Sequence, residues 1–236
     1  MDLMFLHKQG GFMKAWDGGD VHTKDGILSA ADVKKGGLAK TTKGVEYLVV
    51  EPTIRDRIQN MKKGARPIYE YDAGLIAALL GIDGESVVLE AGTGSGCMTM
   101  VLANIAKKVE TFEKEERFYT IAAGNFEKAG IKNIKNANKD LLEAKLGDYD
   151  AVFLDMRDPV KGIEKAAPHL KQGRFMAIFT PIIDDLKPIA QKLEEIGFIE
   201  TRIIQLDLKE LEVKKYARVK GLFGFPGFVI VARKFS

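Results

Sequence analysis

The pattern of apolar and polar residues divides the chain near residue 65. Before this point, short apolar segments alternate with turn residues such as Asp17–Asp20, Lys24–Gly26 and Lys35–Gly37, and they end with the apolar run Tyr47–Val50. Short strands between glycine-containing turns are typical of a small all-β module. We therefore expect a β-rich domain over residues 1–64 and a second, larger domain over residues 65–236.

Helical and strand-like patterns alternate in the larger domain. The segments that predict helices are 72–80, 97–107, 115–129, 160–170 and 183–196, and those that predict strands are 86–89, 109–112, 134–137, 149–154 and 174–180. This alternation is typical of a parallel sheet with helices on both faces. Two more strand-like segments, 198–208 and 228–232, are separated by a basic, glycine-containing stretch and predict a closing antiparallel hairpin. The expected fold class is α/β.

A glycine-rich turn follows the first strand of this pattern. Residues 87–96 read V-V-L-E-A-G-T-G-S-G, so Gly92, Gly94 and Gly96 stand at alternate positions. Glycines let the backbone bend sharply and come close to a ligand. A dinucleotide fingerprint needs G-x-G-x-x-G, but Cys97 occupies the place of its third glycine. The turn therefore predicts a cofactor site of another kind.

With the preceding acidic residue, the turn reads E-x-G-x-G-x-G and resembles motif I of the class I S-adenosylmethionine-dependent methyltransferases. The resemblance implies a Rossmann-like sheet, with S-adenosyl-L-methionine as the cofactor and its methionine part beside the glycine turn. The residues expected to bind the cofactor are Glu90, Gly92, Thr93, Gly94, Ser95, Gly96, Glu113, Asp140 and Asp155.

Four of these residues are acids at the predicted carboxyl ends of strands, which is where open α/β sheets bind ligands. A single acid in such a position is more often a turn or cap residue, but four on one edge indicate a site. Glu113 is placed to accept hydrogen bonds from both ribose hydroxyls, and Asp140 from the adenine amino group. The side chain of Glu90 could serve only to orient the turn.

The sequence after the fourth predicted strand limits the classes of substrate that a methyltransferase of this kind could methylate. Enzymes that methylate the exocyclic amino group of adenine carry N-P-P-Y or D-P-P-Y there, whereas residues 154–159 read L-D-M-R-D-P. The cysteine nucleophile of pyrimidine C5 methylation is also missing from this position. Methylation of the exocyclic amino group of adenine is therefore improbable, and the sequence gives no support for pyrimidine C5 methylation.

Several short sequence segments, in their order along the chain, resemble those of the tRNA adenine-N1 methyltransferase family, TrmI. They are Y-E-Y-D-A-G at 69–74, Gly81-Ile82, the glycine turn, Phe112-Glu113 and Leu154-Asp155. The resemblance runs from about Arg66 to Lys234, and the upstream β module agrees with the small amino-terminal domain of the family. Leu211-Glu212-Val213 and residues 228–234 resemble its terminal hairpin.

This resemblance implies methylation of N1 of the T-loop adenosine at tRNA position 58, and in some archaeal members also at position 57. It makes Asp155 and Tyr69 the expected catalytic residues. Asp155 would accept a hydrogen bond from the target amino group and offset the positive charge that develops on the base. Tyr69 would line the same pocket. The resemblance also implies a homotetramer with tRNA as its substrate.

The chain departs from the family pattern at several places. Q-I-x-Y-P-K-D is replaced by P-I-Y-E-Y-D at 67–72, without the glutamine and lysine, and P-N-x-x-Q becomes P-I-I-D-D at 181–185. Leu211 replaces a tryptophan, and Arg218-Val219 replaces an Arg-Pro pair. Since these departures concern substrate placement, two alternatives stay open: a class I methyltransferase for a protein or small molecule, and a non-catalytic RNA-binding subunit.

Charge adds little to this interpretation. The net charge is +3, too small to indicate a nucleic-acid binder by itself, and the excess lies within residues 1–64. Two basic stretches are equally well explained as phosphate contacts or as solvated surface. They are the Lys34–Gly44 segment and the hairpin residues Lys209, Lys214, Lys215, Arg218 and Lys220.

The remaining composition indicates the cellular compartment and bears on metal and membrane binding. One cysteine, Cys97, excludes an internal disulfide and suits a reducing compartment, and the three scattered histidines, His7, His22 and His169, make a metal site improbable. No apolar run reaches the length of a membrane span, and the amino terminus lacks a secretory pattern. We expect a cytoplasmic protein without a metal or a membrane partner.

Overall fold

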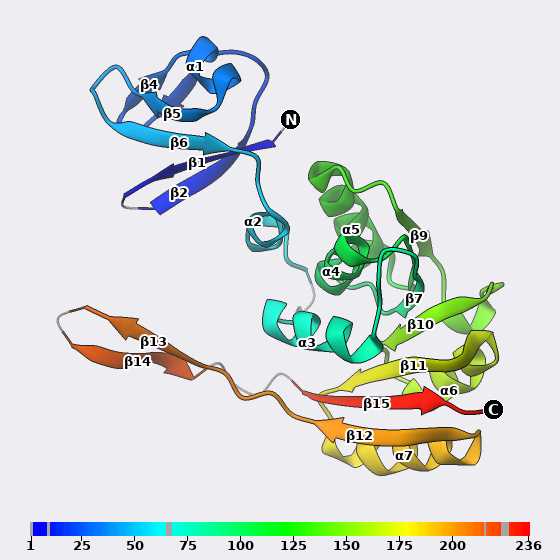
Figure 1. Ribbon diagram of the computed structural model, residues 1–236. Coiled ribbons are helices and arrows are strands. Elements are labelled where there is room, and N and C mark those ends of the chain that lie inside the picture. Colours follow the sequence, from blue (N-terminus) through cyan, green and yellow to red (C-terminus); the bar gives the residue numbers. More distant parts are fainter. Residues whose placement is uncertain (1, 9, 65–67, 215, 223–226) are drawn as a thin grey trace. The chain divides into compact units, whose positions relative to one another are not determined.

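The computed structural model describes residues 2–8, 10–64, 68–214, 216–222 and 227–236. The chain forms two compact units (Figure 1). The first comprises Met1–Lys62 together with Lys128–Gly130, and the second comprises Lys63–Glu127 and Ile131–Ser236.

The first unit is built on a four-stranded antiparallel sheet in the order β2-β1-β6-β5. Alternate residues such as Phe5, Tyr47 and Val49 face a buried core that also contains Leu28. The strands of the unit are β1 (Asp2–His7), β2 (Gly10–Ala15), β3 (Val21–Thr23), β4 (Gly26–Leu28), β5 (Gly37–Lys40) and β6 (Glu46–Val50). The β3 and β4 strands form a separate antiparallel pair.

The prediction of a purely β module missed two short helices, α1 (Ala30–Lys35) and α2 (Ile54–Asn60). Each begins at a capping residue: Ser29 Oγ accepts from the Asp32 backbone N–H at 3.1 Å, and Thr53 and Asp56 form a reciprocal capping box. Within the basic Lys34–Gly44 segment, Lys34 and Lys35 end α1, Gly37–Lys40 form β5, and residues 41–44 form the turn that follows.

The second unit holds a seven-stranded sheet in the order β12-β15-β11-β10-β7-β8-β9. The strands β11, β10, β7, β8 and β9 are parallel to one another, and β15 is antiparallel to both of its neighbours. The strands are β7 (Val87–Ala91), β8 (Lys108–Glu113), β9 (Ile134–Asn138), β10 (Tyr149–Leu154), β11 (Leu170–Thr180), β12 (Phe198–Ile204) and β15 (Phe228–Lys234).

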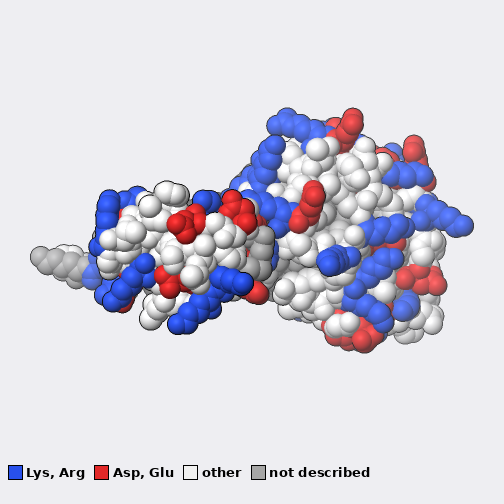
Figure 2. Space-filling model, turned by 90° about the horizontal axis from the view of Figure 1, so that it is seen from above, with Lys and Arg blue, Asp and Glu red and all other residues white. Residues whose placement is uncertain are grey.

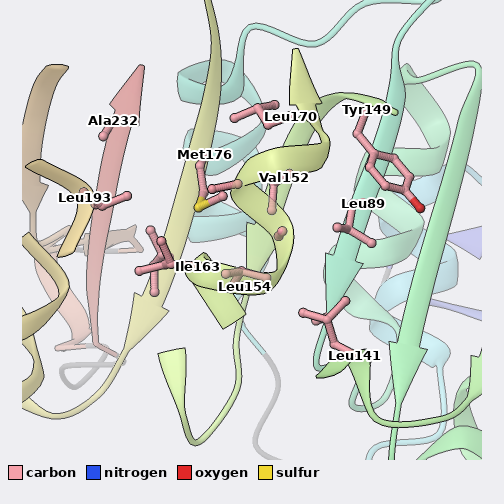
Figure 3. Close-up of a cluster of buried hydrophobic side chains, with 14 of the residues drawn as sticks. Leu89, Leu141, Tyr149, Val152, Leu154, Ile163, Leu170, Met176, Leu193 and Ala232 are labelled. Carbon is pink, nitrogen blue, oxygen red and sulfur yellow. The ribbon is translucent and has the colours of Figure 1, made fainter. Parts of the chain in front are cut away.

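Both faces of the central strands of this sheet, such as β7 and β10, are buried. Val88 and Phe153 belong to one core cluster with Ile76 of α3 and Leu102 of α4, whereas the next residues along the strands point to the other face. There Leu89, Val152 and Leu154 lie in a second cluster with helical residues such as Ile163 and Leu193 (Figure 3). The helices are α3 (Glu70–Leu80), α4 (Cys97–Ile105), α5 (Glu116–Ala129), α6 (Pro159–Ala166) and α7 (Leu186–Glu195).

The α/β class predicted from the sequence is confirmed, and most differences concern element ends. The predicted strand 149–154 coincides with β10. The helix predicted over 160–170 ends at Ala166, since Pro168 lies in a following 3₁₀ turn (Ala167–His169) and β11 begins directly after it. Another 3₁₀ turn, Ile183–Asp185, precedes α7.

The basic, glycine-containing stretch between β12 and β15 contains further strands. It forms its own antiparallel hairpin, β13 (Lys209–Val213) and β14 (Ala217–Leu222). Leu211 pairs with Val219, and both side chains are exposed, as is that of Val213. Of the basic residues predicted here, Lys215 and the side chain of Lys220 lie outside the part of the chain that the structure describes. In that part, no helix has the length and apolar character needed to cross a bilayer.

Candidate active site

A cavity of about 300 Å³ opens at the carboxyl ends of the central parallel strands. Its walls come from the turn after β7 and from the residues that follow β8, β9 and β10. Seven of the residues predicted for the cofactor line it: Gly92, Thr93, Gly94, Ser95, Glu113, Asp140 and Asp155. The structure therefore brings together residues that are up to 63 positions apart, as expected for the ligand edge of an open α/β sheet.

The glycine turn adopts a backbone that other residues would resist. Gly92, Gly94 and Gly96 have φ values of +86°, +56° and +88°, in the left-handed region that favours glycine. A Cβ on Gly92 would overlap the carbonyl group of Asp155, and one on Gly96 would overlap the Phe126 ring of α5. The spacing of the glycines thus brings the turn against the end of β10.

Glu113 fastens this turn to the end of β8. Its side chain is buried, with Oε2 accepting from the Gly94 N–H and Oε1 from the Glu115 N–H, each at 2.9 Å. Each carboxylate oxygen can accept a further hydrogen bond. Glu113 can therefore bind two hydroxyls of a ribose while it holds the turn in place.

Asp140 lies at the next strand end. Its Oδ1 accepts from the Leu142 N–H at 2.9 Å and caps the 3₁₀ turn Leu141–Glu143, whereas its Oδ2 has no hydrogen bond with any residue that the structure describes. Apolar side chains from Phe112, Leu141 and Leu142 line the cavity beside it. An acceptor at the edge of an apolar slot suits a flat base with an exocyclic amino group.

Asp155 follows β10 and faces the cavity from the other side of the turn. Burial raises the pKa of its carboxyl group to about 7, and the negative charge of Glu113 adds to this shift. No side-chain hydrogen bond to Asp155 occurs among the residues that the structure describes. The carboxylate is therefore free to bind a ligand group or an incoming substrate.

Glu90 lies beneath the turn and outside the cavity lining. Its side chain is fully buried, Thr99 Oγ1 donates to its Oε2 at 2.5 Å, and its Oε1 has no hydrogen-bond partner in the described part of the chain. Burial raises the pKa of Glu90 to about 8, although the hydroxyls of Thr99 and Thr111 oppose the shift. Glu90 thus supports the turn from the sheet side, where Thr93 also meets Thr111 at 2.6 Å.

Two more predicted residues lie outside the lining. Gly96 is the left-handed N-cap of α4. Tyr69 is the N-cap of α3 and is half-buried, while its neighbour Ile68 lines the cavity. The catalytic role of Tyr69 stays a prediction.

The structure also adds residues that the sequence reasoning did not assign to the site. Most directly follow a strand end or the glycine turn, so proximity to those positions was the available signal. They are Ile68, Ala91, Cys97, Met98, Phe112, Lys114, Glu115, Phe118, Lys139, Leu141, Leu142, Met156, Arg157 and Asp158. Burial raises the pKa of the Cys97 thiol to about 12, which makes it a packing residue rather than a nucleophile.

The donor set favours an organic nucleoside ligand over a metal ion. No cluster of three or more His, Cys, Asp or Glu side chains suited to a metal occurs in the described part of the chain. The buried Glu113 carboxylate, the apolar slot and the Asp155 carboxyl group with a pKa of about 7 fit a nucleoside ligand.

Comparison with known proteins agrees with this chemistry. Residues 47–221 match the family model described as "tRNA methyltransferase complex GCD14 subunit". The tRNA (adenine(58)-N(1))-methyltransferase TrmI of Thermus thermophilus is 33% identical over 88% of this chain and 82% of its own. The TrmI of Methanocaldococcus jannaschii, named for adenines 57 and 58, is 30% identical over 88% and 86%.

Two solved structures share the fold over the whole chain. An S-adenosylmethionine-dependent O-methyltransferase from Thermotoga maritima superposes with a TM-score of 0.84 at 27% identity, covering 100% of this chain and 93% of that one. The tRNA (m1A58) methyltransferase TrmI from Aquifex aeolicus gives a TM-score of 0.80 at 23% identity, with coverage of 100% and 97%.

Proposed function

The chain belongs to the GCD14 family of tRNA methyltransferases, and from this premise we propose that it transfers a methyl group from S-adenosylmethionine to N1 of an adenosine in tRNA. The target is the T-loop adenosine at position 58, after which the bacterial relatives are named. Position 57 is the second position to map, because the Methanocaldococcus relative is named for both.

The single observation that carries the reaction is the unpaired carboxylate of Asp155 at the cavity wall. Adenine N1 has a lone pair and attacks the sulfonium methyl without losing a proton, so the product base becomes cationic. Asp155, in its ionised form, accepts a hydrogen bond from the exocyclic amino group and aligns N1 with the methyl group. The same negative charge stabilises the positive charge that develops on the base.

Three groups of the cavity wall support the proposal that the cofactor is S-adenosylmethionine. Glu113 would bind the ribose hydroxyls, Asp140 would bind the adenine amino group, and the glycine turn would hold the methionine part; all three line the cavity. Bound S-adenosylmethionine supplies an electrophilic methyl group. Tyr69, at the start of α3, takes a place against the target base, next to Ile68 in the cavity wall.

The substrate requires more surface than one small chain offers, because N1 lies on the pairing edge and the base must be extracted into the pocket. We place the chain in a homotetramer, with hairpin residues such as Lys209, Lys214 and Arg218 contacting phosphates. Basic side chains are spread over the visible face among acidic ones (Figure 2). The tRNA substrate assigns the protein to the cytoplasm.

The test uses labelled S-adenosylmethionine, an unmodified tRNA transcript and transcripts changed at A57, A58 or both. We expect label in the wild-type transcript and its loss with the A58 change, and a fall of about 10²-fold or more in rate for Asp155→Ala. Label elsewhere in the RNA would reassign the target. An absence of label from every RNA would refute the proposal.

The likeness to the Thermotoga O-methyltransferase favours a second candidate, a hydroxyl-bearing small molecule. That reaction requires a base to remove the hydroxyl proton, and a carboxyl group with a pKa of about 7 could serve. The tRNA assay separates the two candidates, since only the first makes methyl transfer depend on RNA.

A further inference from the structure

The order of the strands indicates the side from which a substrate reaches Asp155. Along the carboxyl edge of the parallel strands the order is β11, β10, β7, β8 and β9 (Figure 1). The glycine turn, Glu113 and Asp140 lie at the ends of β7, β8 and β9, and Asp155 follows β10. The proposed cofactor therefore takes the β7–β9 side of Asp155, and the end of β11 is the neighbouring element on the other side.

The segment after β11 begins beside Asp155. Leu154, the last residue of β10, is paired with Ile178 of β11, and β11 continues to Thr180. Since neighbouring strands lie about 5 Å apart, the chain that follows Thr180 leaves the sheet close to Asp155. This segment is not part of the cavity lining. Its position makes it a contact for a substrate rather than for the cofactor.

Two isoleucines in this segment are held in solvent by a hydrogen-bonded turn. Ile182 and Ile183 are 52% and 65% exposed. The hydroxyl of the buried Thr180 accepts from the Ile182 N–H at 3.1 Å and donates to Asp185 Oδ2 at 2.8 Å. The Asp185 N–H donates to the Ile182 carbonyl at 3.2 Å. These bonds fix the turn, so the two apolar side chains are presented at a defined place next to the site.

The chemistry of the turn favours the bases of an RNA over its phosphates. Asp184 is exposed in the same turn and Asp185 adds a second carboxylate, and both would repel a phosphate group. Apolar side chains such as isoleucine can instead insert between stacked bases. The exposed Arg157, which lines the cavity after β10, supplies the positive charge that a neighbouring phosphate requires.

A base that is extracted into the pocket leaves a gap in the RNA stack. Loss of stacking opposes extraction, and the base returns to the stack unless something compensates for this loss. An apolar side chain in the vacated place restores contact with the neighbouring bases. The pair beside Asp155 has the composition and the position for this task.

We propose that Ile182 and Ile183 occupy the space that the target adenosine vacates and contact the bases on either side of it. The inference rests on the proposed function, because it requires an RNA whose base enters the pocket. The two isoleucines touch no reacting atom. They are positioning residues, which act by keeping the target base out of the stack and within reach of Asp155.

The experiment measures extraction of the base directly. A tRNA transcript with 2-aminopurine at position 58 fluoresces more strongly when this base leaves the stack, and S-adenosylhomocysteine fills the cofactor site without methyl transfer. We expect the wild type to raise the fluorescence and Ile182→Ser with Ile183→Ser to lose about half of this rise or more. For the unmodified transcript, kcat/KM should fall about tenfold. The Kd of S-adenosylhomocysteine should change by less than about twofold, the range of an ordinary surface substitution.

Two further double variants are matched controls. Ile182→Leu with Ile183→Leu keeps the apolar volume and should retain both the fluorescence rise and the rate. Ile105→Ser with Ile199→Ser changes two isoleucines that are 38% and 42% exposed, at the end of α4 and near the start of β12. These positions lie away from the carboxyl edge of the sheet, so this variant should behave as the wild type. Unfolding curves verify that each variant is folded.

The possible outcomes separate the inference from the proposed function. An unchanged fluorescence rise and rate in the serine variant would overturn the inference and leave the proposed function intact. A smaller mass of this variant in light scattering would also overturn it, because the two isoleucines would then lie between copies of the chain. A wild-type protein that methylates no RNA would overturn both the inference and the proposed function.

Discussion

Asp155 and Glu90 show how the same chemical group acquires two roles from its position. Both carboxyl groups have a raised pKa because they are buried, to about 7 and about 8. Asp155 lines the cavity without a hydrogen-bond partner in the described chain, whereas Glu90 lies under the glycine turn with a threonine hydroxyl. The Asp155 carboxyl group can therefore contact a ligand, whereas the Glu90 carboxyl group can affect only the stability of the glycine turn and the sheet.

The pH dependence of methyl transfer should follow the ionisation of the Asp155 carboxyl group. Since only the ionised carboxylate stabilises a cationic product, kcat/KM with S-adenosylmethionine limiting should fall about tenfold per pH unit below pH 7, as its pKa of about 7 requires. Initial rates in constant-ionic-strength buffers from pH 5 to 9 measure this. Asp155→Asn should leave a small rate without this inflection, and a wild-type profile that is flat between pH 5.5 and 8 would contradict the assignment.

The pH dependence of the free energy of unfolding should follow the ionisation of the Glu90 carboxyl group. Its pKa is higher in the folded protein than the ordinary value of 4.5, so its contribution to stability is complete below that value and is lost as the pH rises through about 8. For this one group, the free energy of unfolding should fall by about 1.4 kcal/mol per pH unit within this window. Urea unfolding of Glu90→Gln at several pH values should show a shallower slope than the wild type. Identical slopes would count against a buried, neutral Glu90.

The sequence predicted the turn residues because glycine spacing is a local backbone constraint. It could not decide which side of the sheet Glu90 faces, since that depends on where the strand ends. The strand predicted over 86–89 continues to Ala91. Glu90 is therefore a strand residue with a buried side chain, not part of the turn that follows. The helix predicted from residue 72 begins at Glu70, which makes Tyr69 a cap.

At the scale of elements, the turn between β7 and α4 is the part of the site where substitutions should be least tolerated. Gly92→Ala would place a Cβ on the carbonyl of Asp155 at a φ of +86°, so we expect loss of S-adenosylhomocysteine binding or of folding. Gly124→Ala in α5 is the matched control, because its position is exposed with open space around the Cα. That change should stabilise the helix by roughly 0.5–1 kcal/mol. Thermal unfolding and calorimetry measure both variants, and normal binding by Gly92→Ala would refute the steric argument.

Other elements were predictable to different degrees for physical reasons. Strands such as β10, buried on both faces, are continuous apolar runs with clear ends. The β13–β14 hairpin alternates charged and apolar residues over only five or six positions, which resembles an irregular surface stretch. Its register shifts between Glu210 and Leu211, and such a shift depends on cross-strand pairing rather than on local sequence.

At the scale of the whole molecule, the hairpin leaves an apolar surface uncovered. Leu211, Val213 and Val219 are more than half exposed on one face, while Glu212 pairs with Arg218 on the other at 2.7 Å. Exposed apolar surface of this kind commonly marks an interface. The tetramer expected from the family resemblance would bury it between copies of the chain.

Light scattering after size-exclusion chromatography tests this expectation. The wild type should have a mass near four times the 26.1 kDa of one chain. Leu211→Glu with Val213→Glu should give a smaller species, because charged side chains would have to be buried in the interface. Glu212→Gln on the opposite face is the control and should keep the wild-type mass. An unchanged mass in the double variant would place the interface elsewhere.

The two backbone hydrogen bonds on Glu113 also bear on the speed of binding. Because hydrogen bonds within the chain itself tie the glycine turn to the end of β8, an arriving nucleoside should meet a surface that is already shaped. Encounter is then limited by diffusion rather than by a closing step, and nucleosides that fit the pocket arrive at similar rates. The enzyme would distinguish them by how long each one stays.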